Sequence, residues 1–135
     1  MTLSPAAYDT IKAHFADTGR SASDYDAIVT GDLGVVGHDI LLDLFKKDGL
    51  DLTALYMDCG MLIYDLDEQD VHAGGSGCGC AASVFSSYFL PGMMSNRWQN
   101  LLFCATGALL SPTSALQGES IPGICHAIEL TVKGA

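Results

Sequence analysis

Positively charged residues are scarce in this sequence: its 135 residues include 6 Lys and Arg against 16 Asp and Glu, a formal net charge of −10. Nucleic acids are bound mainly through lysine and arginine contacts with their phosphates, so this balance excludes a nucleic-acid partner. It equally excludes a polybasic patch that binds anionic lipid. Any anionic ligand must instead be bound by local hydrogen-bond donors, against an unfavourable overall field.

A membrane span and a disulfide framework are also missing. No apolar run reaches the ~18 residues of a spanning helix, and the N-terminus lacks the basic and apolar segments of a signal peptide. The five cysteines are odd in number and unevenly spaced, which favours a reducing compartment. We therefore expect a soluble, cytoplasmic-type chain that reaches a membrane only by docking on it.

The composition predicts one folded domain over residues 1–135. Hydrophobic residues make up 49% of the chain and charged residues 16%, which excludes a disordered chain. The mean hydropathy of +0.29 is high for a free-standing domain. It indicates that another chain or segment covers part of the apolar surface.

The order of helix and strand patterns predicts an α/β fold. The expected helices cover residues 4–18, 36–47 and 81–89, and the expected strands cover residues 25–32, 100–109 and 124–130, with a weaker strand at 55–65. This order predicts a mixed, mostly parallel sheet with an antiparallel last strand. Because such sheets usually open with a strand, the first strand is expected to be missing.

Several details of these elements are predicted as well. We expect Ser4 to cap the first helix, Val36 to lie on the apolar face of the second, and residues 91–92 (Pro-Gly) to cut off the third. In the last strand, His126 is interpreted as a core histidine rather than a catalytic one. His14 and His38 are expected on helix surfaces.

The stretch VHAGGSGCGCAAS, residues 71–83, is the most unusual part of the sequence. Its glycines precede a helix, where free backbone N–H groups favour an anion, but the lysine and Ser/Thr of a P-loop are absent. Glycines equally allow a sharp turn from a strand into a closely packed helix. Both interpretations stay open.

The same stretch offers two other kinds of site. A metal site of His72, Cys78 and Cys80 is disfavoured, because the C-x-C spacing places the two sulfurs on opposite sides of a helix. Cys78 at a helix start is a candidate nucleophile with His72 as its base, although cysteines beside alanines are more often core residues. The acidic residues 65–70 are interpreted as a solvated turn, since they lack the glycine and terminal glutamate of a calcium loop.

The polar connection at residues 111–123 is longer than a hairpin needs. Its hydroxyl, amide and carboxylate groups, among them Ser114 and Glu119, offer donors and acceptors without a cation. Connections of this kind often line ligand pockets.

Four segments carry a resemblance. DYDAIVTGDLGVVG, DVHAGGSGCGCAASV and LLFCATGALLSPTSALQGESIPGICHAIEL closely resemble the C-terminal part of the stage V sporulation protein AD family, and SPAAYDTIKAHFADTG resembles the helix before them. The resemblance covers nearly all of the chain. It implies the C-terminal half of a thiolase-like fold, and a role in binding dipicolinic acid (pyridine-2,6-dicarboxylate) and taking it up into the developing spore.

The resemblance also implies partners: other stage V sporulation membrane proteins, with peripheral association at the forespore or spore inner membrane. Condensing enzymes of this fold carry their nucleophilic cysteine in the other half. Their histidine position corresponds to residues 30–32, and their asparagine position to Gly74 or Gly75. The chain is therefore expected to be no enzyme and to need no cofactor, with calcium left open as a companion of dipicolinate.

The ligand-binding hypothesis places dipicolinate at His72, Gly74, Gly75, Ser76, Gly77, Ser114 and Glu119. Two alternatives remain. In the first, the chain is a protein-interaction module without a small-molecule site, and its partner could be a second copy of itself. In the second, it keeps a residual acyl-transfer activity at Cys78.

Overall fold

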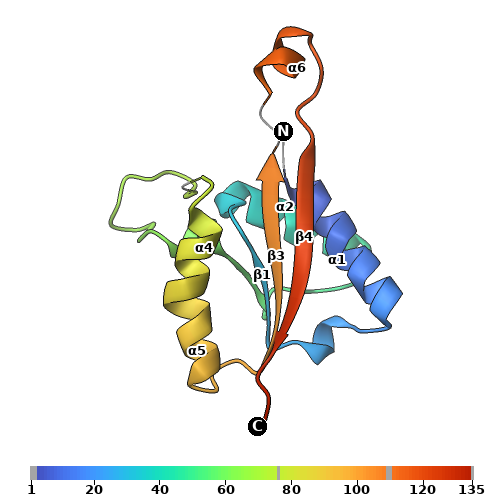
Figure 1. Ribbon diagram of the computed structural model, residues 1–135, viewed down its shortest axis with the longest axis vertical. Helices are drawn as coiled ribbons and strands as arrows, with labels where there is room; N and C mark the ends of the chain where they lie inside the picture. Colours follow the sequence, from blue (N-terminus) through green and yellow to red (C-terminus); the bar gives the residue numbers. More distant parts are fainter. Residues whose placement is uncertain (1–2, 76, 109–110, 135) are drawn as a thin grey trace.

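The computed structural model describes residues 3–75, 77–108 and 111–134, which form an α/β fold (Figure 1). A four-stranded sheet has the order β2-β1-β3-β4. β1 runs parallel to β2 and to β3, and β4 runs antiparallel to β3. The strands are β1 (Ala27–Thr30), β2 (Tyr56–Asp58), β3 (Asn100–Ala108) and β4 (Gly123–Thr131). The predicted mixed sheet with an antiparallel last strand is confirmed.

Helices cover both faces of the sheet (Figure 1). α1 and α2 lie on one face, and the helix formed by α4, η2 and α5 lies on the other. The bounds are α1 (Ser4–Thr18), η1 (Ala22–Asp24), α2 (Gly34–Lys47), α3 (Cys59–Leu62), α4 (Cys80–Val84), η2 (Phe85–Phe89), α5 (Leu90–Met94) and α6 (Pro112–Leu116). The polar connection between β3 and β4, predicted without regular structure, therefore contains α6.

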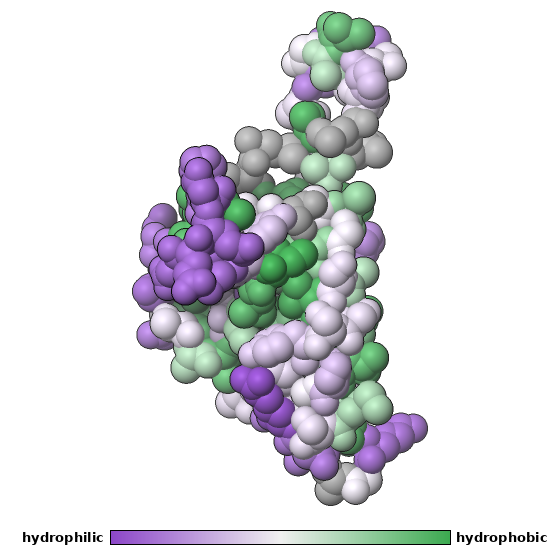
Figure 2. Space-filling view, turned by 90° about the vertical axis from the view of Figure 1, so that its left-hand side faces the viewer, coloured by the Kyte–Doolittle hydropathy of each residue, from purple (hydrophilic) through white to green (hydrophobic). Residues whose placement is uncertain are grey.

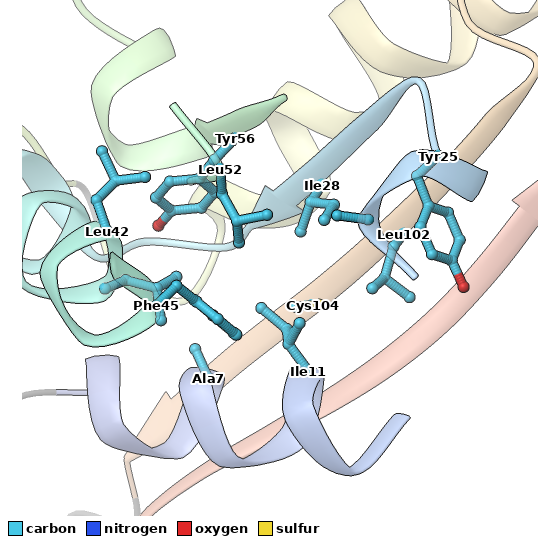
Figure 3. Close-up of a cluster of buried hydrophobic side chains, with 12 residues drawn as sticks. Ala7, Ile11, Tyr25, Ile28, Leu42, Phe45, Leu52, Tyr56, Leu102 and Cys104 are labelled. Atoms are coloured by element: carbon cyan, nitrogen blue, oxygen red, sulfur yellow. The ribbon is translucent and has the colours of Figure 1, made fainter. Parts of the chain in front are cut away.

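Each face of the sheet has its own hydrophobic core. Under α1 and α2, Ile11, Ile28 and Leu102 are fully buried (Figure 3). Under the opposite helix, Phe89 packs against Trp98 with ring centroids 5.2 Å apart. Burying one side chain of this size contributes about 1.5–3 kcal/mol, so the two cores are the main source of stability.

The third helix is not cut off at residues 91–92. It runs from Cys80 to Met94, with a π-helical turn, η2, in the middle. Leu90 N–H donates to Phe85 O across that turn, and Pro91 follows at the start of α5. Pro91 has no N–H to donate, and it follows closely on the wider π-helical turn, so the helix continues through it. The predicted interruption was wrong.

The ends of α1 and α2 also differ from expectation. Ser4 makes no cap; its hydroxyl donates to Gly37 O (2.8 Å), because α1 crosses α2 closely at that glycine. Val36 is 61% exposed, and Gly37 takes the inward position instead. The weak strand at residues 55–65 is a strand only at Tyr56–Asp58, and α3 follows it at once.

Three histidines were placed wrongly. His126 is exposed, because β4 is an edge strand whose outer face, with Ile124 (51% exposed) and Ile128 (52%), is not covered. His38 and His14 are half-buried rather than on the surface. The His38 ring stacks on Tyr56 with centroids 4.6 Å apart, and His14 hydrogen-bonds the hydroxyl of the Tyr25 ring.

Candidate functional site

At the carboxyl ends of β1 and β2, the loops that follow the strands meet the glycine-rich segment before α4. Val35 N–H donates to Ala73 O (2.8 Å), and Gly75 N–H donates to Gly60 O (2.8 Å). Gly74 has a φ of +77°, and a side chain there would overlap Gly60 O. The close packing of this turn against Gly60 therefore requires glycine at residue 74. Ligands of open parallel sheets bind at this edge, which makes it the candidate site.

A buried carboxylate, Asp58, ties the two strand ends together. It is 1% exposed and accepts hydrogen bonds from Thr30 Oγ1 (2.6 Å), Leu33 N–H (2.9 Å) and Gly34 N–H (2.9 Å). Since Thr30 donates to Asp58, its oxygen accepts from the Tyr56 hydroxyl (2.6 Å). Burial raises the pKa of Asp58, whereas its three donors act in the opposite direction. The network holds the start of α2 against β2.

A second carboxylate, Asp32, lies at the mouth of the site. Its Oδ2 accepts a hydrogen bond from Gly77 N–H (2.8 Å). Gly60 separates the two carboxylates: a Cβ on it would lie 2.5 Å from Asp32 Oδ1 and 2.9 Å from Asp58 Oδ2. The charge of Asp32 adds to the rise in the pKa of Asp58. The glycine-rich segment thus donates to a carboxylate of the chain itself.

The residues of the glycine-rich segment that were predicted to bind dipicolinate differ from one another in exposure and in hydrogen bonding. His72 has a φ of 50°, and its side chain is 90% exposed, 3.8 Å from Asp70. The N–H groups of Gly75 and Gly77 are used within the chain, by Gly60 O and Asp32. Ser76 lies outside the described residues. An added anion at this segment must therefore displace Asp32 or bind beside it.

The other two predicted residues lie elsewhere. Ser114 is in α6, where its N–H donates to Ser111 Oγ (3.3 Å), and Glu119 N–H donates to Ser114 O (3.0 Å). Figure 1 places α6 beyond the end of the sheet, apart from the glycine-rich segment. The structure therefore does not bring Ser114 and Glu119 together with Gly74–Gly77.

Cys78 lies on an apolar groove. With Phe85, Phe103 and Ile128 it lines a hollow of about 270 Å³ between α4 and the uncovered part of the sheet. Figure 2 shows hydrophobic side chains gathered in a hollow on this side of the molecule. Cys78 is exposed, and within the described residues no base contacts it; His72 contacts Asp70 instead.

Two negative findings concern the described part of the chain. It contains no group of three or more His, Cys, Asp and Glu side chains that could hold a metal ion. None of its helices combines the length and the apolar composition needed to cross a membrane.

One buried side-chain oxygen, Thr106 Oγ1 next to Gly31, has no hydrogen-bond partner within the described residues.

Comparison with known proteins assigns the family. The family model of stage V sporulation protein AD matches residues 1–131. The chain belongs to the stage V sporulation protein AD family. It is 48% identical over 126 residues to stage V sporulation protein AD of Bacillus subtilis (strain 168), which covers 93% of this chain and 37% of that relative. The chain thus spans little more than a third of the length of that relative, and membership supports a sporulation-related role.

The ligand-site residues predicted from the sequence did not include Asp32 and Asp58. Asp32 ends the strand expected at residues 25–32, whereas Asp58 lies inside the one expected at residues 55–65, which the structure ends at Asp58. Because the carboxyl ends of parallel strands share one edge, this position was a signal for Asp32, and finding Asp58 required the true end of β2.

Proposed function

We propose that this chain is the dipicolinate-binding part of a non-catalytic sporulation protein that serves uptake of dipicolinic acid into the developing spore. Membership of the stage V sporulation protein AD family carries the proposal. The glycine-rich segment supports it chemically, because Gly77 N–H already donates to a carboxylate, that of Asp32. A ligand carboxylate suits the same donor.

The local charge decides which form of the ligand binds best. Free dipicolinate is a dianion, and both Asp32 and the net charge of −10 repel it. Its one-to-one calcium chelate is neutral, so this repulsion is removed. We therefore propose that the chelate binds more tightly than the free dianion, with calcium as part of the cargo rather than as a resident metal.

The absence of catalysis is part of the proposal. The histidine and asparagine positions of condensing enzymes are occupied by residues 30–32 and by Gly74 or Gly75, none of which carries an imidazole or a side-chain amide. Residual acyl transfer at Cys78 would need a base, and His72 makes its nearest charged contact with Asp70. Thiol labelling of Cys78 with a depressed pKa would contradict this part.

Titration of the ¹⁵N-labelled chain with dipicolinate, followed by amide NMR with and without equimolar calcium, tests the proposal. Shifts should concentrate in residues 72–80 and be stronger with calcium. Isophthalate, which lacks the ring nitrogen, is the matched control ligand. Dispersed spectra that ignore both forms of dipicolinate at millimolar concentration would contradict the proposed site.

An isosteric variant sharpens this test. Asp32→Asn keeps an acceptor for Gly77 N–H and removes one negative charge. A unit charge about 4 Å away in water contributes ~1 kcal/mol, so affinity for the free dianion should rise about fivefold. Asp67→Asn makes the same change of net charge at an exposed turn and should leave affinity nearly unchanged. Equal effects of the two variants would mean that only the overall field matters.

A second function is favoured by one surface. Leu90 (42% exposed), Met94 (78%), Ile124 and Ile128 leave an apolar face over α5 and β4. A face of this kind marks a protein-interaction module, whose partners would be a second copy of the chain or other stage V sporulation membrane proteins that hold it at the forespore membrane. Sedimentation equilibrium tests the homodimer: a monomer throughout the micromolar range would count against it.

A further inference from the structure

Two free cysteines lie next to each other on β3 and β4, and Cys104 is the register partner of Thr30 on β1. Cys104 is opposite Ala127, and Cys125 is opposite Thr106, so the two thiols are diagonal neighbours on one face of the sheet. Cys104 belongs to the core that α1 and α2 cover, as Figure 3 shows, and Cys125 packs against this core. Thr10 of α1 donates to the Cys125 carbonyl oxygen (3.0 Å), which places α1 over the pair.

The surroundings of the two thiols are unequal. Cys104 is fully buried, whereas Cys125 is half-buried on the edge strand β4. A hydrogen bond from the thiol of Cys104 lowers the pKa of Cys125, whereas burial acts in the opposite direction and Thr10 adds a smaller lowering. The same bond, together with burial, raises the pKa of Cys104. Of the two adjacent thiols, Cys125 at the sheet edge is therefore the less buried, and Cys104 lies behind it in the core.

We propose that Cys125 and Cys104 form a reversible redox pair, in which Cys125 reacts with a low-molecular-weight disulfide and Cys104 resolves the product. The Cys125 thiolate attacks one sulfur of the external disulfide, forms a mixed disulfide and expels one thiolate. Cys104 then loses its proton to that thiolate, attacks the Cys125 sulfur and expels the second thiolate. The two protein thiols are oxidised, and the external disulfide is reduced to two thiols.

The position of the pair determines what the bond would do. Diagonal cross-strand neighbours have Cα atoms about 7–8 Å apart, slightly more than a relaxed disulfide spans, and most of that separation lies along the strands, so the bond requires a local shift of β4 along β3. A disulfide of this kind is readily reduced again. It would cross-link the two strands at the root of the connection that carries α6.

The test uses the whole chain with Cys78→Ser, which removes the exposed thiol. The protein is treated with hydroxyethyl disulfide, free thiols are blocked with iodoacetamide, and peptides are analysed without reduction. No Lys or Arg lies between Arg97 and Lys133, whereas Glu119 does, so a glutamyl endopeptidase separates the two cysteines. Peptides containing Cys104 and Cys125, joined with loss of two hydrogens and separated by dithiothreitol, are expected.

Labelling rates provide a second measurement. In the reduced protein, Cys125 should react with iodoacetamide at least about tenfold faster than Cys59, whose pKa burial raises to about 12. Cys104→Ala removes the S–H donor and should slow the labelling of Cys125 severalfold. Because Cys59 is fully buried, its labelling rate reports whether the variant still folds.

Three results would overturn the proposal. One is a stable mixed disulfide at Cys125 with Cys104 still free, which would remove the resolving role. Another is a link between other cysteines, such as Cys59 and Cys80. The third is full labelling of both Cys104 and Cys125 after an oxidant dose that completely oxidises Cys78 in the unsubstituted chain.

Discussion

Removing the carboxylate of Asp58 should destabilise the whole fold, since three donors lose their acceptor at once. Two of them, on Thr30 and Gly34, belong to buried residues. A buried donor left unpaired costs about 1–3 kcal/mol, and loss of a desolvated charge offsets part of this. We expect Asp58→Ala to lower the free energy of unfolding by about 2–4 kcal/mol. Asp58→Asn, which keeps one acceptor oxygen, should cost about half as much.

Urea denaturation followed by the fluorescence of Trp98 measures this change, because the chain has one tryptophan and it is buried against Phe89. Asp67→Ala, at an exposed position, is the matched control for loss of a carboxylate. A loss under about 1 kcal/mol for Asp58→Ala, or one equal to that of the control, would refute the idea that this network holds α2 against β2.

The contribution of Asp58 to the free energy of unfolding should also depend on pH. Burial raises the pKa of Asp58 above that of an unfolded aspartate. The folded state therefore binds this proton more tightly, and the contribution to stability is complete below the unfolded pKa and is lost as pH rises through the folded one. As pH rises through the folded-state pKa, the unsubstituted chain should lose stability relative to Asp58→Asn, so the difference between their unfolding free energies should become smaller. A difference that is flat from pH 3 upward would contradict the raised pKa.

Two further predictions concern other parts of the molecule. A methyl group on Gly92 would overlap the Trp98 ring, so Gly92→Ala should cost about 1–3 kcal/mol and change the near-ultraviolet dichroism of that ring, whereas Gly107→Ala has room. Burial and Glu129 raise the pKa of Tyr25 to about 12. Stability should therefore fall as pH rises from ~10 through 12, and Glu129→Gln should lower the Tyr25 midpoint in an absorbance titration. An unshifted midpoint in that variant would contradict the contact.

The order of apolar patterns in the sequence by itself determined the α/β class and the antiparallel last strand, because apolar periodicity and glycine positions reflect local backbone geometry. The family was indicated by the resemblance of four segments. The end of α1 at Gly19, with a φ of +68°, is one example. The hydrogen bonds of Asp32 and Asp58 were decided only by tertiary structure, since their donors come from loops that only the strand order brings together. Likewise, His126 was interpreted as a core histidine, but whether a helix covers its face of β4 depends on the position of β4 at the sheet edge.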